Sequence, residues 1–155
     1  MPQSTNNNRP YDERSAGGLV YKREGNKIYW LVIKTAGREK TKTFYKLSKG
    51  HTRNQEYLKQ TALREVEEEG QIKAKIVAKL GSNNYFIWDR QQRKRIVKKV
   101  TFFLMEYTGE SRLRHYDAEM VIDHEWLPLE KAMKKLTFEG ERKLLQKALK
   151  YLENH

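Results

Sequence analysis

The sequence predicts an α/β fold in which helices cover both faces of a mixed β-sheet, an α/β/α sandwich. Runs rich in β-branched and aromatic residues recur along the chain, and other segments carry apolar residues at helical spacing. Because strands and helices are interleaved, a sheet between helices is the natural packing. The length of 155 residues corresponds to one domain.

The first strands are expected at 18–22 and 28–34, since both segments are rich in residues that favour extended backbone. The Glu-Gly-Asn run at 24–26 separates them as a turn. A short strand at 44–47 should follow.

The strongest helical segment is 54–69, which is rich in Glu, Gln, Leu, Ala and Arg and contains no Gly or Pro. Asn54 is its expected N-cap. Glu65, Glu68 and Glu69 occupy positions i, i+3 and i+4 and therefore share one face. The apolar residues at helical spacing that should face the core are Leu58, Ala62, Leu63 and Val66.

The second half of the chain is expected to form a hairpin, one further strand and two helices. The expected bounds are 75–88 and 96–107 for the hairpin strands, 121–126 for the last strand, and 129–135 and 138–153 for the helices. The polar run 90–95 should form the hairpin turn. In the last helix Leu144, Leu145 and Ala148 recur at helical spacing.

Acidic residues gather at 50–72, in a chain whose net charge is +12. This segment holds five acids and three bases, a net charge of −2, so the rest of the chain carries +14. Carboxylates one helical turn apart repel each other by a few tenths of a kcal/mol per pair, and Mg²⁺ or Mn²⁺ would remove that repulsion. The alternative is a solvated Glu-rich face paired with Arg64 and Lys59.

The same stretch resembles the Nudix box, which reads G, five residues, E, seven residues, then R-E-U-x-E-E-x-G-U with U aliphatic. The matching positions are Gly50, Glu56, Arg64, Glu65, Val66, Glu68, Glu69 and Ile72. The chain is thus identified as a member of the Nudix hydrolase family. It has Gln71 where the family has its second glycine, and Gly70 stands one place earlier. We therefore expect Gly70 to form the left-handed turn at the helix end.

Other segments resemble the family members that hydrolyse diadenosine polyphosphates. These segments are A-G-G-L-V-Y at 16–21, Y-K-L-S-K-G-H at 45–51 and H-E-W-L-P-L-E-K-A at 124–132. Two departures are Ser48, where those enzymes usually have proline, and Gln55, where a glycine often stands.

The resemblance implies the roles of the acidic residues. Divalent metal, Mg²⁺ or Mn²⁺, would be held by Gly50, Glu65, Glu68 and Glu69. Glu65 is also the candidate general base, and Arg64 with Glu56 would orient the other groups. Glu119 lies where many Nudix enzymes carry a further catalytic acid, although a surface glutamate is nearly as common there.

The expected substrate-binding residues are basic or aromatic. Lys49 and His51 flank Gly50 and would face phosphates, as the resemblance implies. Six bases lie at 90–99, dense enough to attract a polyphosphate or an RNA backbone, and Lys98 and Lys99 are favoured for substrate contact. Tyr85 is the aromatic favoured to stack on a base. Alone, each of these residues is also compatible with an ordinary solvent-exposed position.

The leading hypothesis is a metal-dependent hydrolase that cleaves a phosphoanhydride in nucleoside diphosphate derivatives, with dinucleoside polyphosphates first. RNA ends remain possible substrates. The alternatives are a catalytically silent Nudix module that binds a nucleotide or RNA as a regulator, and a purely RNA-binding protein. A purely RNA-binding protein would not account for the residues of the Nudix box.

The composition excludes other classes of site and suggests a compartment. The chain contains no cysteine, so no disulfide or thiolate metal site can form. No apolar run is long enough to span a membrane, and a cytoplasmic monomer or homodimer is expected. Residues 1–15 are polar and are expected to form a flexible arm before a single domain at 16–155.

Overall fold

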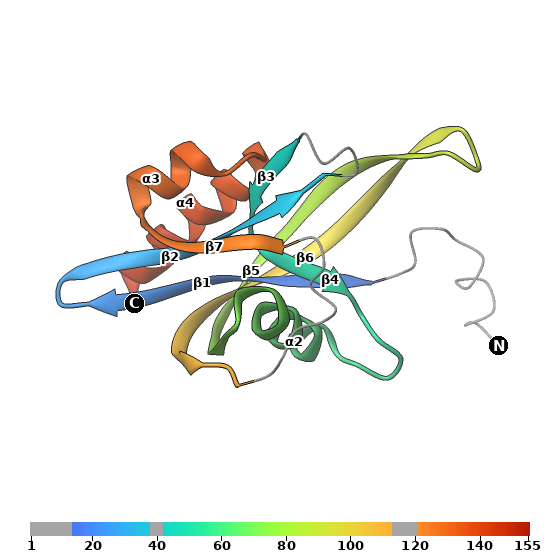
Figure 1. Cartoon of the computed structure of the whole chain (residues 1–155). Helices are drawn as coiled ribbons and strands as arrows, with labels where there is room; N and C mark the ends of the chain where they lie inside the picture. Colours follow the sequence, from blue (N-terminus) through green and yellow to red (C-terminus); the bar gives the residue numbers. More distant parts are fainter. Residues whose placement is uncertain (1–13, 38–41, 113–120) are drawn as a thin grey trace.

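The computed structural model describes residues 14–37, 42–112 and 121–155. Its strands are β1 (Ser15–Glu24), β2 (Lys27–Ala36), β3 (Thr43–Lys46), β4 (Ser48–His51), β5 (Ile72–Asp89), β6 (Lys94–Glu110) and β7 (Val121–Pro128). Its helices are α2 (Leu58–Gly70), α3 (Leu129–Lys135) and α4 (Glu139–Asn154). Figure 1 shows these elements. The N-terminal arm expected at 1–15 falls almost entirely outside the described residues.

Strand β1 lies inside a seven-stranded mixed sheet of order β3-β2-β1-β6-β5, with β4 also paired to β1 and β7 to β2. The pairing of β1 with β6 is parallel, and its pairings with β2 and β4 are antiparallel. The mixed sheet expected from the sequence is therefore confirmed.

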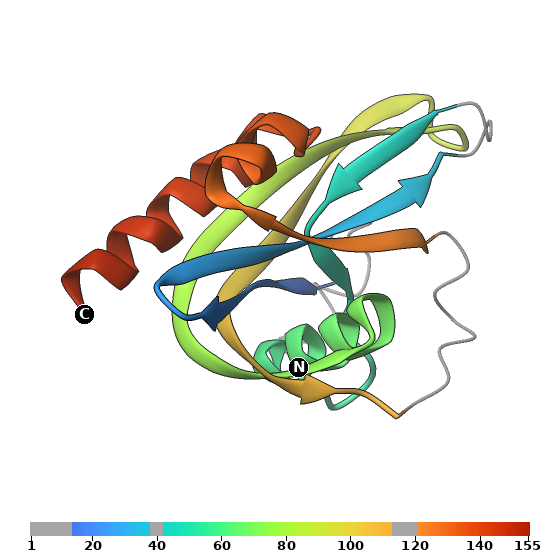
Figure 2. The ribbon, with the colours of Figure 1, turned by 60° about the vertical axis from the view of Figure 1, so that its left-hand side comes forward.

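Two hydrophobic cores lie on opposite faces of the sheet, because side chains alternate along its strands. In β1, Leu19 belongs to the core that includes Leu144 and Leu145 of α4, and Val20 belongs to the core that includes Val66 of α2. Figure 2 shows α2 and α4 on either side of the strands. This arrangement confirms the α/β/α sandwich.

The later elements match their predicted positions. Helix α3 has the expected bounds, and α4 differs from its prediction by one residue at each end. The expected hairpin is formed by β5 and β6, and it extends well beyond the body of the sheet (Figure 1). None of the described helices combines the length and apolar character needed to cross a bilayer.

Both ends of α2 differ from their predictions. The helix begins at Leu58, and its N-cap is Tyr57 instead of Asn54. The Tyr57 backbone N–H donates to Oε1 of Gln60 at 2.8 Å, so the glutamine side chain satisfies the amide group at the N-cap. At the other end, Gln71 and not Gly70 adopts the left-handed conformation, with φ 59° and ψ 33°. The prediction for Gly70 is therefore wrong.

Steric contact explains the glycine at position 70. Gly70 is buried inside the last turn of α2, and a Cβ atom there would lie 2.7 Å from Cδ2 of Leu31 on β2. The glycine therefore permits close packing of the helix on the sheet. The Gln71 backbone N–H donates to the carbonyl of Glu67 at 3.0 Å and closes the helix.

Candidate active site

A bidentate ion pair joins the loop before α2 to the middle of that helix. Nε of Arg64 donates to Oε2 of Glu56 at 2.8 Å, and Nη2 donates to Oε1 at 2.9 Å. The two side chains are mostly buried. The expected pairing of Arg64 with Glu56 is thus present, although Glu56 precedes the helix instead of lying on it.

Arg64 also contacts two of the three clustered glutamates. Its Nη1 lies 2.8 Å from Oε1 of Glu65 and 3.4 Å from Oε2 of Glu68. Its Nη2 donates to the backbone carbonyl of His51 at 2.8 Å. The guanidinium therefore fixes the carboxylates of α2 relative to strand β4.

Strand β4 contacts the glutamate cluster on the side opposite Arg64. A Cβ atom at Gly50 would overlap the carboxylate of Glu65, so this position requires glycine for steric reasons. The backbone N–H of Lys49 donates to Oε1 of Glu69 at 2.8 Å. Gly50 lies within a paired strand, and its backbone approaches the acidic side chain of Glu65 closely.

Three carboxyl groups of the box, Glu56, Glu65 and Glu69, experience different electrostatic environments. Burial raises the pKa of Glu69 to about 7, with a further contribution from the neighbouring Glu65 charge. Burial also raises the pKa of Glu65, against the opposing effect of Arg64. By contrast, hydrogen bonds from Arg64 lower the pKa of Glu56 to about 2.

The chemistry of the donor set fits a hard divalent cation. Carboxylate oxygens are the ligands that Mg²⁺ and Mn²⁺ take in proteins. Glu65 and Glu69 both face the short segment Lys49–Gly50, since one touches position 50 and the other binds the amide of Lys49. Within the described part of the chain, no group of three or more Asp, Glu, His or Cys side chains is arranged so that it could hold a metal ion. Arg64 and Arg53 hold Glu68 instead.

Basic side chains lie beside these carboxylates. Nζ of Lys98, on β6, is 2.6 Å from Nε2 of His51, and the other ring nitrogen of His51 is 3.3 Å from the Ser15 hydroxyl. Lys49 is largely buried, and this burial lowers its pKa to about 8. The expected pair Lys49 and His51 is thus joined by Lys98 from a distant strand.

The structure separates Lys98 from Lys99. Lys98 is opposite Tyr85 in the hairpin register, and Lys99 is opposite Asn84. Because neighbouring residues of a strand point to opposite faces, only Lys98 shares a face with Tyr85. Lys99 is exposed on the other face.

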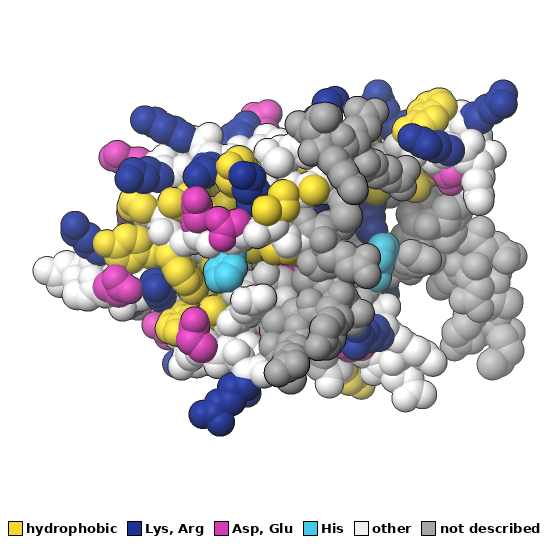
Figure 3. Space-filling view, in the orientation of Figure 1, with side chains coloured by type: hydrophobic (Ala, Val, Ile, Leu, Met, Phe, Trp, Pro, Cys, Tyr) yellow, Lys and Arg dark blue, Asp and Glu magenta, His cyan; other side chains and the backbone are white. Residues whose placement is uncertain are grey.

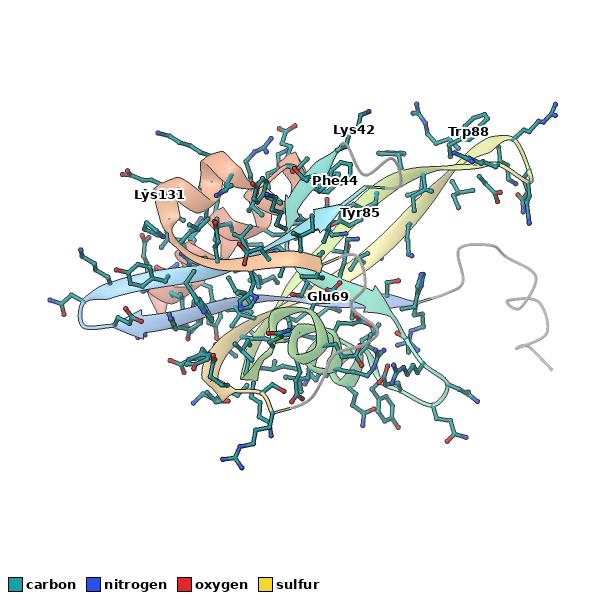
Figure 4. The ribbon with its side chains drawn as sticks, in the orientation of Figure 1. Lys42, Phe44, Glu69, Tyr85, Trp88 and Lys131 are labelled. Carbon is teal, nitrogen blue, oxygen red and sulfur yellow. The ribbon has the colours of Figure 1, made fainter. Side chains whose placement is uncertain are left out.

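Tyr85 forms part of a pocket wall. The hydroxyl group of Tyr85 donates to Oε2 of Glu141, and its ring meets the edge of Phe138 at a centroid distance of 5.6 Å. Nζ of Lys49 lies 4.6 Å from the centre of the Tyr85 ring. Figure 4 shows Tyr85 and Glu69 near the middle of the molecule. The expected stacking role of Tyr85 stays a prediction.

The adjoining pocket has a volume of about 460 Å³. It is lined by Lys49, by Asn83–Ile87 of β5 and by Phe138–Gly140 at the start of α4. The residues Asn83, Asn84 and Phe138 were not predicted as site residues. Their signal in the sequence is weak, because nothing there indicates that the start of α4 packs against β5.

Glu141 is a second group that the sequence analysis did not identify. It is fully buried, accepts a hydrogen bond from the Leu47 backbone N–H at 2.9 Å, and has its pKa raised by this burial. A signal was present: position 141 precedes Leu144, Leu145 and Ala148 on the same helical stripe, so a glutamate there must be buried. The other predicted acid, Glu119, lies outside the described residues.

Comparison with known proteins supports the assignment made from the box. The NUDIX domain model matches residues 12–148. This chain belongs to the Nudix family. The protein named MutT4 of Mycobacterium tuberculosis is 33% identical over 142 residues, which cover 90% of this chain and 56% of that protein. This chain thus spans little more than half the length of that relative.

Solved structures of Nudix proteins share the fold. An Ap4A hydrolase of C. elegans, solved as a binary complex, matches with a TM-score of 0.67 and 21% identity, covering 92% of this chain and 99% of that one. The NUDIX domain of Shewanella oneidensis NrtR, solved with ADP ribose, matches with a TM-score of 0.60 and 16% identity, covering 98% of each chain. The Nudix fold expected from the sequence is therefore confirmed. At these identities the neighbours show the fold alone.

Proposed function

We propose that the protein hydrolyses a phosphoanhydride bond in nucleoside diphosphate derivatives, with dinucleoside polyphosphates such as diadenosine tetraphosphate as the preferred substrates. The observation that carries this proposal is the meeting of acidic and basic groups across β4. Glu65 and Glu69 lie against the segment that presents Lys49 and His51, and Lys98 reaches the same place from β6.

Each group has a role in this reaction. Glu65, Glu68 and Glu69 with the backbone of Gly50 would hold Mg²⁺, which when bound would supply an activated water and neutralise phosphate charge. Glu65 accepts the proton of the attacking water. Arg64 holds the glutamates in place, and Glu56 fixes the guanidinium. Glu119 would be a further acid in this reaction.

The basic residues bind the substrate. Lys49, His51 and Lys98 contact the phosphate chain, and the pocket beside Lys49 accepts one nucleoside. A volume of about 460 Å³ falls in the range typical of small-molecule sites. A second nucleoside, connected through the phosphates, extends from this pocket toward solvent.

A catalytically silent module that binds nucleotides as a regulator is the second candidate. The complete set of box glutamates and the Arg64–Glu56 ion pair favour an enzyme instead, because a silent module does not need an oriented carboxylate cluster. The compartment and assembly proposed for the domain are the cytoplasm and a monomer or homodimer.

A hydrolysis screen that quantifies the nucleotide products by ion-exchange chromatography tests the proposal. Purified protein with Mg²⁺ is supplied with diadenosine tetraphosphate, nucleoside diphosphate sugars, oxidised nucleoside triphosphates and 5′-triphosphorylated RNA. We expect the highest kcat/KM for diadenosine tetraphosphate. Turnover of none of these compounds, despite tight nucleotide binding by calorimetry, would identify the silent module.

A further inference from the structure

Glu141 is a buried acid that the proposed reaction does not use. Its side chain has no exposed surface. Figure 3 shows other acidic side chains at the surface of one face of the molecule, several of them beside Lys or Arg. Burying a carboxyl group costs free energy unless hydrogen bonds compensate. The two groups that donate hydrogen bonds to Glu141 therefore indicate what this side chain does.

The Oε1 atom of Glu141 holds the residue that joins two strands. Leu47 stands between β3 and β4, and its buried backbone N–H donates to this oxygen at 2.9 Å. The residues that follow, Ser48, Lys49 and Gly50, belong to the strand that faces the carboxylate site. This hydrogen bond therefore connects α4 to the chain directly before the segment proposed to bind phosphates.

The Oε2 atom of Glu141 holds one wall of the pocket beside Lys49. The hydroxyl group of Tyr85, on β5, donates to this oxygen. The Tyr85 ring also packs against the ring of Phe138 with an interplanar angle of 83°. The plane of the Tyr85 ring is therefore fixed by two contacts, one at its hydroxyl group and one with a neighbouring ring.

The start of α4 is anchored to both sides of this arrangement. The backbone N–H of Thr137 donates to the carbonyl of Tyr45 at 2.9 Å, and the Tyr45 N–H donates to the Thr137 hydroxyl at 2.9 Å. A Cβ atom at Gly140 would overlap the side-chain amide of Asn83, so the first turn of α4 lies directly against β5. Glu141 thus belongs to a segment that is fixed relative to β3 and β5.

We infer that Glu141 is a positioning residue that aligns the nucleoside pocket with the phosphate-binding strand β4. It acts through Tyr85 on the pocket and through Leu47 on β4, and it is not among the residues that line the pocket. Nζ of Lys49 lies 4.6 Å from the centre of the Tyr85 ring, so a shift of this ring changes the place where pocket and phosphate site meet. The inference deepens the proposed function and rests on it for the identity of the ligand.

Binding is measured without turnover, so that its outcome is separate from that of the hydrolysis screen. Calorimetry in EDTA gives the affinity for adenosine monophosphate, which requires the pocket, and for inorganic tripolyphosphate, which requires only the basic residues. In Glu141→Gln the single acceptor oxygen can still serve the Leu47 N–H, but Tyr85 loses its carboxylate. This variant should bind adenosine monophosphate about threefold or more weakly, the factor expected for one lost hydrogen bond, and tripolyphosphate as the native protein does.

A double variant tests whether Glu141 acts through Tyr85. Tyr85→Phe removes the hydroxyl group alone and should weaken the binding of adenosine monophosphate to a similar extent. The double variant Tyr85→Phe/Glu141→Gln should bind it no more weakly than Glu141→Gln, because two residues that act as one unit give losses that do not add. An unspecific loss of packing would instead weaken the binding of both ligands.

NMR reports on Tyr85 without any ligand. In protein labelled with ¹³C at the ring carbon that bears the tyrosine hydroxyl, Tyr85→Phe removes one signal and thereby assigns it. Glu141→Gln should move this signal, because the hydroxyl group loses its carboxylate acceptor. Matched controls are Glu153→Gln, an exposed position of α4, and Tyr29→Phe on β2, outside the pocket. Both should leave the Tyr85 signal and the affinity for adenosine monophosphate unchanged.

Three results would overturn the inference. The first is an equal affinity for adenosine monophosphate in the native protein and Glu141→Gln. The second is a set of losses that add in the double variant, because Glu141 would then act independently of Tyr85. The third is a Tyr85 signal that Glu141→Gln does not move. If the native protein binds no adenosine monophosphate, the proposed nucleoside pocket is wrong, and the NMR comparison alone decides whether Glu141 positions Tyr85.

Discussion

The carboxylate of Glu56 and the guanidinium of Arg64 form two parallel hydrogen bonds of 2.8 and 2.9 Å across the start of α2. Planar groups paired in this way fix orientation as well as distance. The same guanidinium reaches Glu65, Glu68 and the carbonyl of His51. Arg64 is therefore the residue through which the loop, the helix and strand β4 are held together.

Arg64→Lys should lower kcat on diadenosine tetraphosphate by about tenfold or more, since lysine retains the charge but not the fork, and charge-assisted hydrogen bonds contribute about 1.5–3 kcal/mol. Steady-state kinetics and a thermal melt test this expectation. Lys59→Ala, on the exposed side of α2, should leave kcat unchanged. Full activity of Arg64→Lys would contradict an orienting role.

Glu68→Gln and Glu69→Gln should each lower turnover by about a hundredfold or more, because each removes a charge that would hold the metal in the proposed reaction. The fold should survive, since glutamine at position 69 still accepts the hydrogen bond from the Lys49 amide. The rate of nucleotide product formation at several Mg²⁺ concentrations, with circular dichroism, provides the measurement. Substantial activity in both variants would exclude the metal-binding role.

His51→Ala should reduce kcat/KM for dinucleoside polyphosphates more than for a nucleoside diphosphate sugar. His51 is in contact with Lys98, and the longer phosphate chain reaches more of this basic group. Parallel assays of both substrates with native and variant protein give the ratio. Equal losses of kcat/KM on both substrates would contradict the proposed similarity of this site to that of the diadenosine polyphosphate hydrolases.

Gln71→Gly should stabilise the protein by about 0.5–1 kcal/mol, because a left-handed φ of 59° is strained for any residue with a side chain. For a domain of this size we expect a Tm about 1–4 °C higher. Gly70→Ala should destabilise the protein by about 1–3 kcal/mol, since the new methyl group would meet Leu31. Thermal melts that show no gain for Gln71→Gly would argue against strain at that position.

Glu141→Gln should change how stability depends on pH. Burial raises the pKa of Glu141, and the hydrogen bonds from Tyr85 and Leu47 and the charges of Lys49 and Lys46 offset that effect only in part. A carboxyl group with a raised native pKa holds its proton longer when folded, so its contribution to stability falls as pH rises above the unfolded pKa of about 4.3.

The measurement is denaturant unfolding of Glu141→Gln and native protein at pH 5 and pH 8. Relative to native protein, the variant should gain stability at the higher pH, because a neutral amide has no charge to desolvate. A difference between the two proteins that is the same at both pH values would show that ionisation of Glu141 does not affect folding.

Periodicity predicted the elements that carry long stripes of apolar residues. Leu144, Leu145 and Ala148 defined α4, and alternation in the second half defined the hairpin. The four-residue strand β4 was not predicted, because so short a segment forms only through its pairing with β1. Its Lys49-Gly50-His51 sequence was identified from the family resemblance and not from strand propensity.

The missed features depend on contacts between distant segments. Gly70 was expected to end α2, but its contact with Leu31 could not be known without the sheet. The burial of Glu141 beside Tyr85 required α4 and β5 to pack together. Likewise, Lys98 and Lys99 are equivalent in the sequence, and only the register of the hairpin distinguishes them.

The order of synthesis has a consequence for assembly of the site. The first residues of β1 pair with β4 on one edge and with β6 on the other, at Ala16 with Gly50 and Thr101. During synthesis β1 and β4 leave the ribosome long before β6. The residues of β1 that pair with β6 therefore stay unpaired on that side until β6 has been made. Such distant pairings make folding slow. A nascent chain thus carries its box helix without a complete site, and becomes competent only when the β5–β6 hairpin has emerged.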